Sequence, residues 1–184
     1  MMTNPVPPQV LSLLEPLTFK SMYDLGNKKT DGVPYNGYFR SLGIIYDSID
    51  LNGMDGALPL DLNTEIKLAS RELVSNLGTS EHVLNQEACF RNVHNLSERR
   101  MVHWVPLAKR HPRHGLYGYS VDFFIDLAEA NDYEIDKLYI ETSFKSWKLI
   151  CCSLTKRSAR DFVWREDWFL TANPSGEWGV ATNH

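Results

Sequence analysis

Residues 74–86, VSNLGTSEHVLNQ, pass from apolar β-forming residues through a small polar turn to the charged pair Glu81 and His82. The residues before the turn predict a strand over positions 70–76, and those after it predict a helix over positions 81–96. A turn that only joins a strand to a helix does not need an acidic residue beside a histidine. We therefore expect a strand–turn–helix unit whose turn carries chemistry.

The alternation of strand and helix continues on both sides of this unit. Further strands are predicted at 20–25, 44–51, 100–107, 134–141 and 146–154, and further helices at 34–42 and 121–130, the latter with Ser120 as N-cap. Only a few residues join the last two strands, so they must pair antiparallel. Residues 57–62 form either a very short strand or a loop along the sheet edge, because they follow the previous strand too closely for a crossover. The pattern predicts a three-layer α/β domain with a mostly parallel sheet.

The composition indicates one globular domain over residues 1–184, with a Pro-rich arm at 1–18, a core at 19–156 and an aromatic tail at 157–184. The net charge of -4 and the lack of a basic run argue against a nucleic-acid partner. No apolar run approaches the roughly 20 residues of a membrane helix, and the first residues lack the basic start of a signal peptide. Three cysteines without metal-type spacing fit a reducing compartment, so we expect a cytoplasmic protein.

Candidate ligand-binding residues lie at the strand ends, since ligands of open parallel sheets bind beyond the carboxyl ends of the strands. Asp50 could accept both hydroxyls of a ribose, and Gly26 would let the backbone approach a ligand. The strand-end candidates are Asp24, Leu25, Gly26, Asn27, Asp50, Leu51, Asn52, Asp61, Leu62, Asn76, Leu77, Gly78 and Thr79. The alternative is that the Asp and Asn residues only cap helices and turns.

Four segments in this order, YDLGN (23–27), SIDLN (48–52), ALPLDLN (57–63) and ELVSNLGTSEHV (72–83), resemble the class I S-adenosylmethionine-dependent methyltransferases. The run HGLYGYSVDFFIDLAEANDYEI (114–135) is similar to the segment after the fifth strand in bacterial members, and the resemblance spans residues 20–154. It implies a Rossmann-like fold, S-adenosylmethionine as cofactor, and methyl transfer to an unidentified small-molecule acceptor.

The resemblance also implies roles for the matched residues. Asp24 and Gly26 match the family's cofactor loop near the methionine part of the ligand, and Asp50 matches the acid that binds the ribose. Residues 61–62 match the acidic-apolar pair that reads the adenine, and residues 76–79 match the loop under the transferred methyl.

The chain departs from the family pattern in two places. After Gly26 the usual further glycines are replaced by NKKT (27–30), which includes Lys28 and Lys29, and the second and third helices are nearly absent. This is a version of the fold with minimal helices on one face. An alternative function is therefore a non-catalytic or vestigial S-adenosylmethionine-binding domain that acts through protein partners.

Candidate catalytic residues come from two segments. The resemblance implies that Glu81 and His82 lie at a helix start beside the methyl donor, where His82 could act as a general base. The alternatives are a charge at the helix N-terminus for Glu81 and a half-buried structural role for His82. Two further histidines, His94 and His103, are expected to be structural. No metal site is predicted, because the histidine spacing matches no recognised motif, and a zinc site from the histidines is the alternative.

The loop after the fifth strand supplies the expected acceptor wall, formed by His111, His114, Tyr117 and Tyr119. His114 is also the second candidate for catalysis. We expect residues 109–119 to close over the acceptor, and the alternative is an ordinary surface loop with His114 idle.

The aromatic tail is expected to pack, since Trp164, Trp168 and Phe169 are too apolar to be left free. The tail is expected to cover the sheet, the N-terminal arm or a second subunit. In the last case the tail would provide the contact of a homodimer.

Overall fold

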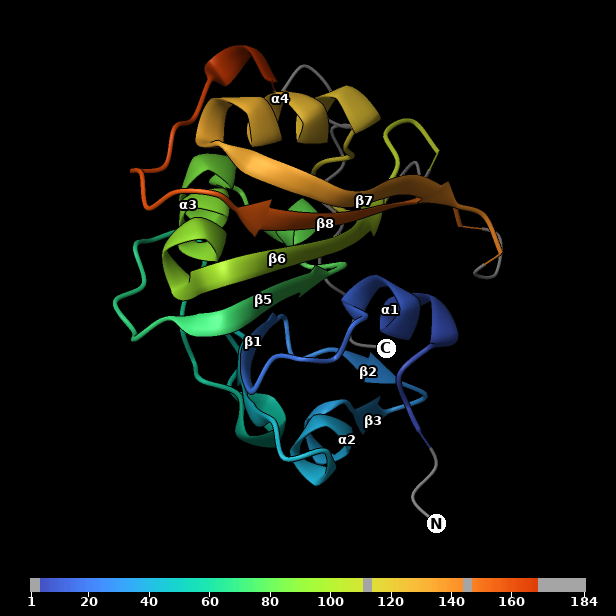
Figure 1. The fold of residues 1–184 in the computed structure, drawn as a ribbon. Coiled ribbons are helices and arrows are strands. Elements are labelled where there is room, and N and C mark those ends of the chain that lie inside the picture. Colours follow the sequence, from blue (N-terminus) through green and yellow to red (C-terminus); the bar gives the residue numbers. More distant parts are fainter. Residues whose placement is uncertain (1–3, 111–113, 144–146, 169–184) are drawn as a thin grey trace.

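The computed structural model describes residues 4–110, 114–143 and 147–168. Its centre is a six-stranded sheet in the order β4-β1-β5-β6-β8-β7 (Figure 1). The strands are β1 (Ser21–Leu25), β4 (Ile45–Ile49), β5 (Arg71–Leu77), β6 (Ser97–Pro106), β7 (Tyr133–Glu141) and β8 (Leu149–Lys156). β1, β4, β5 and β6 run parallel, and β8 runs antiparallel to both of its neighbours, β6 and β7. The predicted mostly parallel sheet with a C-terminal antiparallel strand is confirmed.

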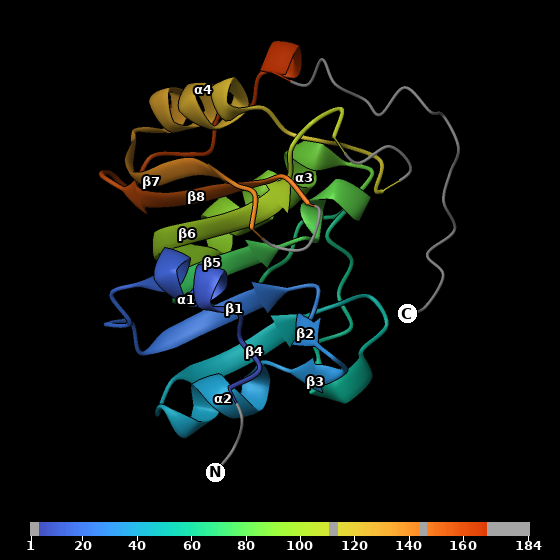
Figure 2. The ribbon, with the colours of Figure 1, turned by 90° about the vertical axis from the view of Figure 1, so that its right-hand side faces the viewer.

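Helices cover both faces of the sheet and make the expected three layers (Figure 2). α3 (Gln86–Leu96) and α4 (Val121–Asn131), of 11 residues each, pack on one face. α1 (Pro8–Leu14) and α2 (Asn36–Ser41), of only 7 and 6 residues, pack on the other. Because side chains alternate along a strand, the adjacent Cys151 and Cys152 enter opposite cores, and both are buried.

The two long helices have side-chain caps at their N-termini. The Asn85 side chain accepts a hydrogen bond from the Ala88 N–H at the start of α3, and the Ser120 side chain accepts one from the Phe123 N–H at the start of α4, as predicted. At the other end of α3, Lys156 Nζ donates to the carbonyls of His94 and Ser97. This amine satisfies carbonyls that a helix terminus leaves without partners.

The predicted helix over residues 81–96 is wrong at its start. A 3₁₀ turn covers Ser80–His82, and α3 begins only at Gln86. The break arises because Asn85 caps the helix, while Asn76 binds Ser80 and holds the preceding turn in a separate conformation. Glu81 is therefore not a charge at the N-terminus of α3.

The segment between β1 and β4 also differs from the prediction. A small antiparallel ribbon, β2 (Lys29–Thr30) and β3 (Val33–Pro34), precedes α2, which is shorter than the predicted helix at 34–42. Two-residue strands have no periodicity that a sequence could reveal.

Within the described residues, the outer edge of β4 pairs with no full strand. A 3₁₀ turn, Met54–Gly56, leads to a loop along the edge with a single parallel bridge between Leu58 and Ile49. Leu58 N–H donates to the Ser48 carbonyl, and the Arg40 guanidinium donates to the Tyr46 carbonyl. Of the two alternatives for residues 57–62, the loop along the sheet edge is observed.

The described part of the tail packs on helices α3 and α4, which were not among the expected surfaces. The Trp164 ring stacks on Phe90 at 6.0 Å, and the buried Trp168, in the 3₁₀ turn Glu166–Trp168, meets Phe123 edge-on at 6.4 Å. Phe169 lies outside the described residues. At the other terminus, Arg100 holds α1 by donating to the carbonyls at its C-terminal end.

Across the described ranges, no helix has both the length and the apolarity needed to cross a bilayer.

Candidate functional site

A cavity of about 380 Å³ lies beyond the carboxyl ends of β1, β4 and β5, where the topology predicts a ligand. It is lined by Gly26, Ile49, Asp50, Leu51, Leu60, Asp61, Leu62, Asn63, Gly78, Thr79, His82 and Val83. Seven of the predicted cofactor-binding residues and one predicted catalytic histidine therefore share one cavity. Asn63 and Val83 are wall residues that the sequence analysis did not assign, although both stand within the quoted segments.

The two acidic residues in the wall each support a turn with one oxygen. Asp50 Oδ1 accepts from the Asn52 N–H at 3.0 Å, and Asp61 Oδ1 accepts from the Asn63 N–H at 2.9 Å. In the described part of the chain, Oδ2 of Asp50 and Oδ2 of Asp61 accept no hydrogen bond. Turn support and ligand binding are therefore compatible for both residues, because each carboxylate keeps one oxygen for a polar ligand.

Asp24 does not line the cavity, because its carboxylate is buried and surrounded by donors. It accepts hydrogen bonds from the Tyr46 hydroxyl at 2.7 Å, the Ser75 hydroxyl at 2.7 Å and the Lys28 N–H at 2.8 Å. Burial raises the pKa of this carboxyl, and the bonds from Ser75, Tyr46 and Lys28 oppose that shift. The structure places Asp24 as a brace beneath the loop that follows β1.

Three further predicted cofactor residues are also positioned by contacts within the chain. Leu25 is fully buried, the Asn27 side chain donates to the Met54 carbonyl, and the Asn52 side chain accepts from the Met54 N–H. Asn27 and Asn52 therefore hold the Met54–Gly56 turn beside the cavity.

Gly26 is required by packing against the neighbouring loop. Its φ is +82°, and a Cβ at this position would lie 2.1 Å from Thr79 Oγ1. That hydroxyl donates to the Leu25 carbonyl at 2.6 Å and joins the ends of β1 and β5. The first glycine of the family loop is thus matched here by a glycine that allows contact between the two loops.

Lys28 stands where the family pattern has a glycine, and its side chain turns back towards the β5 loop. Nζ lies 5.7 Å from the Trp104 ring centroid and close to Gly78, where an added Cβ would be 3.0 Å away. Burial lowers the pKa of Lys28, and the charges of Glu81 and Asp24 act against that decrease. The sequence analysis treated Lys28 only as a lost glycine and missed this contact.

The β5 loop is held by a buried polar network. Asn76 Nδ2 donates to the Ser80 hydroxyl at 2.8 Å and lies 3.2 Å from His103 Nδ1. The Tyr119 hydroxyl lies 2.7 Å from Ser80 Oγ and 2.8 Å from the Gln86 side-chain oxygen. Asn76 and Tyr119, predicted as cofactor and acceptor contacts, are instead buried parts of the scaffold, and Leu77 is buried beside them.

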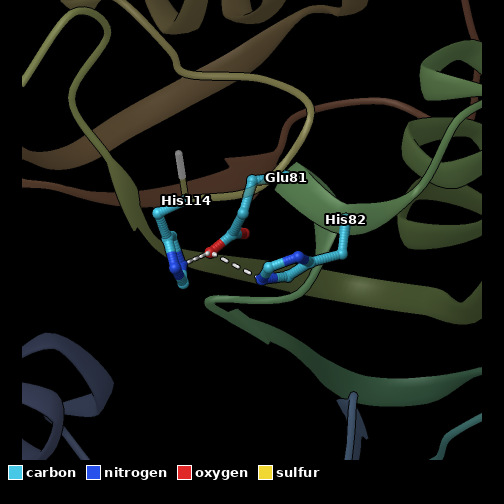
Figure 3. A group of neighbouring side chains, drawn as sticks. All are labelled: Glu81, His82 and His114. Carbon is cyan, nitrogen blue, oxygen red and sulfur yellow. Dashed lines mark ion pairs between the residues drawn. The ribbon is translucent and has the colours of Figure 1, made fainter. Parts of the chain in front are cut away.

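Glu81, His82 and His114 converge at one end of this region (Figure 3). The Glu81 side chain is only 1% exposed, and its Oε1 lies 3.5 Å from His114 Nε2 and 3.9 Å from His82 Nε2. The Glu81 carbonyl accepts the Leu116 N–H at 2.7 Å, which ties the 3₁₀ turn to the loop after β6. The sequence named all three residues but did not indicate that a buried carboxylate joins the two histidines.

His82 is the member of this cluster that lines the cavity. Burial lowers the pKa of His82; the nearby His114 and Lys28 also lower it, while Glu81 opposes them. The imidazole is therefore neutral near pH 7 and able to accept a proton.

The loop after β6 holds the remaining predicted acceptor residues. The His114 ring meets the Trp147 ring edge-on at 4.5 Å, and the Tyr117 hydroxyl donates to the Leu84 carbonyl at 2.9 Å. His111 lies outside the described residues.

The other two histidines that were considered are structural, as predicted. His94 Nδ1 lies 2.6 Å from the Tyr133 hydroxyl and Nε2 lies 3.1 Å from the Arg160 carbonyl, so the ring accepts at the first position and donates at the second. His103 is buried in the sheet, where it stacks on Phe90.

The fold is that of the class I, Rossmann-like S-adenosylmethionine-dependent methyltransferases. Among solved structures, 1,6-didemethyltoxoflavin-N1-methyltransferase of Burkholderia thailandensis matches with a TM-score of 0.65 at 13% identity, over 82% of this chain and 77% of that one. The crystal structure of that enzyme contains 1,6-didemethyltoxoflavin and S-adenosylhomocysteine. Magnesium protoporphyrin IX methyltransferase of Synechocystis PCC 6803, with bound S-adenosylmethionine, matches with a TM-score of 0.58 at 14% identity, over 80% and 76%.

The same fold also serves a different reaction. The (4+2)-cyclase SpnF matches with a TM-score of 0.65 at 9% identity, over 82% of this chain and 80% of its own. No protein-family model matches the sequence, and a sequence search of curated proteins finds no match. At these identities the likeness establishes the fold, and the activity has to be argued from the site.

Proposed function

We propose that this protein transfers a methyl group from S-adenosylmethionine to a small-molecule acceptor. The observation that carries the proposal is one cavity with two strand-end carboxylates in its wall and a neutral histidine beside them. In this arrangement Asp50 binds the ribose hydroxyls and Asp61 accepts from the adenine amino group. Leu62, only 7% exposed, provides an apolar surface for the adenine ring.

The chemistry at the other end of the cavity is proton removal. Methyl transfer breaks the bond from carbon to the sulfonium sulfur and forms a bond from carbon to the acceptor, which releases S-adenosylhomocysteine and a proton. His82 or His114 accepts that proton, and the Glu81 carboxylate stabilises the resulting imidazolium. The rest of the catalysis is alignment of the acceptor with the methyl group.

The size of the cavity suits a small-molecule cofactor. Its volume of about 380 Å³ lies within the range of small-molecule sites. The methyltransferase neighbours are named for 1,6-didemethyltoxoflavin and magnesium protoporphyrin IX, neither of which is a macromolecule, and this supports a small-molecule acceptor here.

A second candidate function is cofactor binding without methyl transfer. The observation that favours it is Lys28, whose half-buried amine lies beside Gly78 in the region that the resemblance assigns to the methyl donor. The sulfonium of S-adenosylmethionine is positive, so a positive amine there would weaken binding of the methyl donor relative to its uncharged product.

Calorimetric titration with S-adenosylmethionine and S-adenosylhomocysteine tests the proposal. We expect both to bind and Asp50→Ala to weaken each by about 2–3 kcal/mol, since the ribose hydroxyls lose a charged acceptor. Asp126→Ala, on the exposed face of α4, is the matched control and should not change binding. Equal affinity in Asp50→Ala and Asp126→Ala would remove the proposed cofactor site, whereas binding of S-adenosylhomocysteine alone would favour the second candidate.

A further inference from the structure

The cluster at the end of the cavity has the donor set of a metal site. Glu81 contributes a carboxylate oxygen, and His82 and His114 contribute ring nitrogens, with all three ligand atoms within 4.8 Å of one another. Two histidines and one carboxylate, with further positions open, are a ligand set of catalytic zinc and non-haem iron centres. In Figure 3 both imidazoles point their Nε2 atoms at the same oxygen of Glu81.

An independent observation comes from the other oxygen of Glu81. Glu81 Oε2 is buried and has no hydrogen-bond partner among the described residues. Its partner oxygen, Oε1, lies 3.5 and 3.9 Å from the two imidazoles, which is beyond hydrogen-bonding distance. The Lys28 amine also borders Gly78, but no ion pair between Lys28 and Glu81 is found among the described residues. A buried carboxylate that is neither hydrogen-bonded nor closely paired is unfavourable, and a bound cation would compensate its charge.

The separations suit an ion after a small adjustment. Bonds of about 2.0–2.1 Å to one tetrahedral ion place ligand atoms roughly 3.4 Å apart. The two separations from Glu81 Oε1, 3.5 and 3.9 Å, are close to this value, and all three ligand atoms lie within 4.8 Å of one another. The two histidine side chains are 49% and 37% exposed, so both rings can turn towards an ion without disturbing the core.

We propose that Glu81, His82 and His114 bind a divalent transition-metal ion at the acceptor end of the cavity, with open positions for water or the acceptor. The site forms only in the folded chain, because residues 81–82 belong to the turn after β5 and His114 belongs to the loop after β6. The Glu81 carbonyl, bonded to the Leu116 N–H, fixes the spacing of these two segments.

The proposal that an ion binds does not require methyl transfer. A role for the ion in catalysis does rest on the proposed function: the ion would coordinate an oxygen or nitrogen of the acceptor and lower the pKa of that group. The histidines would then act as ligands, and the released proton would pass to solvent.

A substitution at Lys28 should change ion affinity in the opposite direction to a substitution of a ligand. An added Cβ at Gly78 would lie 3.0 Å from Lys28 Nζ and 3.4 Å from Glu81 Oε1, so both atoms border the same residue. A positive amine there repels a dication. Replacing it in Lys28→Met should therefore tighten ion binding severalfold.

The test is titration of the untagged full chain with cobalt(II), followed by visible absorption, and with zinc(II) in competition. We expect one ion per chain. Glu81→Gln should weaken binding at least about a hundredfold, because loss of an outer partner alone typically costs 10–100-fold. Glu87→Gln, an exposed carboxylate on α3, is the matched control and should bind as the wild type does.

If Glu81→Gln does not fold, His114→Ala takes its place, because it changes a half-exposed side chain. Thermal unfolding is then measured with and without the ion. The ion should raise the melting temperature of the wild type and not that of His114→Ala. Absence of one-to-one binding in the wild type, or wild-type affinity in both variants, would overturn the metal site. Cofactor titration of the same samples tests the proposed function separately.

Discussion

The two ends of the cavity are built differently. At the end that we propose for the nucleoside, Asp50 and Asp61 each accept a hydrogen bond from the backbone N–H two positions further along the chain. At the end that we propose for the acceptor, Glu81 and His82 meet His114 across a gap of more than thirty residues in the sequence, and Glu81 is a buried carboxylate. The first end is specified locally, whereas the second exists only once the sheet has assembled.

The largest effect that separates the two ends is expected from His114→Ala. The substitution removes a group that we assign to the acceptor and that is not among the residues lining the proposed cofactor cavity. Turnover should fall by about 10²–10⁴-fold, while the affinity for S-adenosylhomocysteine should not change. Steady-state kinetics with an identified acceptor and calorimetry on the same sample provide the comparison. If both quantities are unchanged, the role of the base passes to His82.

A substitution where the loops after β1 and β5 touch should lower the stability of the fold. Gly26→Ala would place a Cβ 2.1 Å from Thr79 Oγ1 at a φ of +82°. We expect the free energy of unfolding to decrease by about 3 kcal/mol, from overpacking together with the left-handed backbone. Denaturant titration measures the change.

Gly43→Ala is the control for this prediction. Gly43 has a φ of +78° and nothing within 4 Å of an added Cβ, so only the backbone contribution of about 1 kcal/mol remains. Equal losses in Gly26→Ala and Gly43→Ala would show that contact between the β1 and β5 loops does not matter.

Acid should destabilise the fold through two buried histidines, His103 beside Asn76 and His94 in the last turn of α3. Burial lowers the pKa of His103 to about 3 and, with the nearby Lys156 charge, that of His94 to about 4. The folded state keeps both rings neutral, whereas the unfolded chain protonates them near pH 6.5. Their contribution is therefore complete above pH 6.5 and is lost as the pH falls towards 4, by about 2 kcal/mol for each histidine at pH 5.

Unfolding measured from pH 8 to pH 5 checks this dependence. His103 Nδ1 lies next to Asn76, which holds the 3₁₀ turn carrying Glu81, so protonation acts on the acceptor end. In His103→Gln, which keeps a hydrogen-bond acceptor, the loss of stability over this range should be about half that of the wild type. A profile identical to the wild type would assign the acid sensitivity to other groups.

The smallest effect is expected at the nucleoside end from Asp61→Asn. The amide oxygen can still accept from the Asn63 N–H, so the turn should remain. Only the charge of the acceptor for the adenine amino group is lost, and cofactor affinity should fall by about 1 kcal/mol. Calorimetry with unchanged thermal unfolding would show a local effect, and a loss of stability would show that the turn needs the charge.

The fold was predictable from the sequence to the extent that it depends on periodicity. The strands and the antiparallel hairpin follow from the alternation of apolar and polar side chains and from short connections. The Ser120 cap follows from the preference of helix N-termini for a side-chain acceptor. The β2–β3 ribbon and the start of α3 at Gln86 were missed, because the first has no period and the second depends on which of several polar residues acts as the cap.

The candidate site was predictable in composition but less so in roles. Asp50 and Asp24 follow the same rule at the ends of strands, yet Asp50 lines the cavity and Asp24 is enclosed by donors from three other residues. Two of those donors, the hydroxyls of Tyr46 and Ser75, come from distant segments, so no local pattern separates a ligand-binding acid from a brace. The burial of Glu81 depends in the same way on the loop after β6.

In the part of the chain that the structure describes, the sheet ends at β4 without the pairing that an outer strand would provide. The carbonyls of Tyr46 and Ser48, which would otherwise face an open edge, accept from the Arg40 guanidinium and the Leu58 N–H. Unpaired edge groups are the usual template on which a strand from another molecule adds and aggregation begins. A guanidinium and one backbone bridge thus close the edge of this sheet where another strand could have paired. The two carbonyls are no longer free to accept hydrogen bonds from a strand of another molecule.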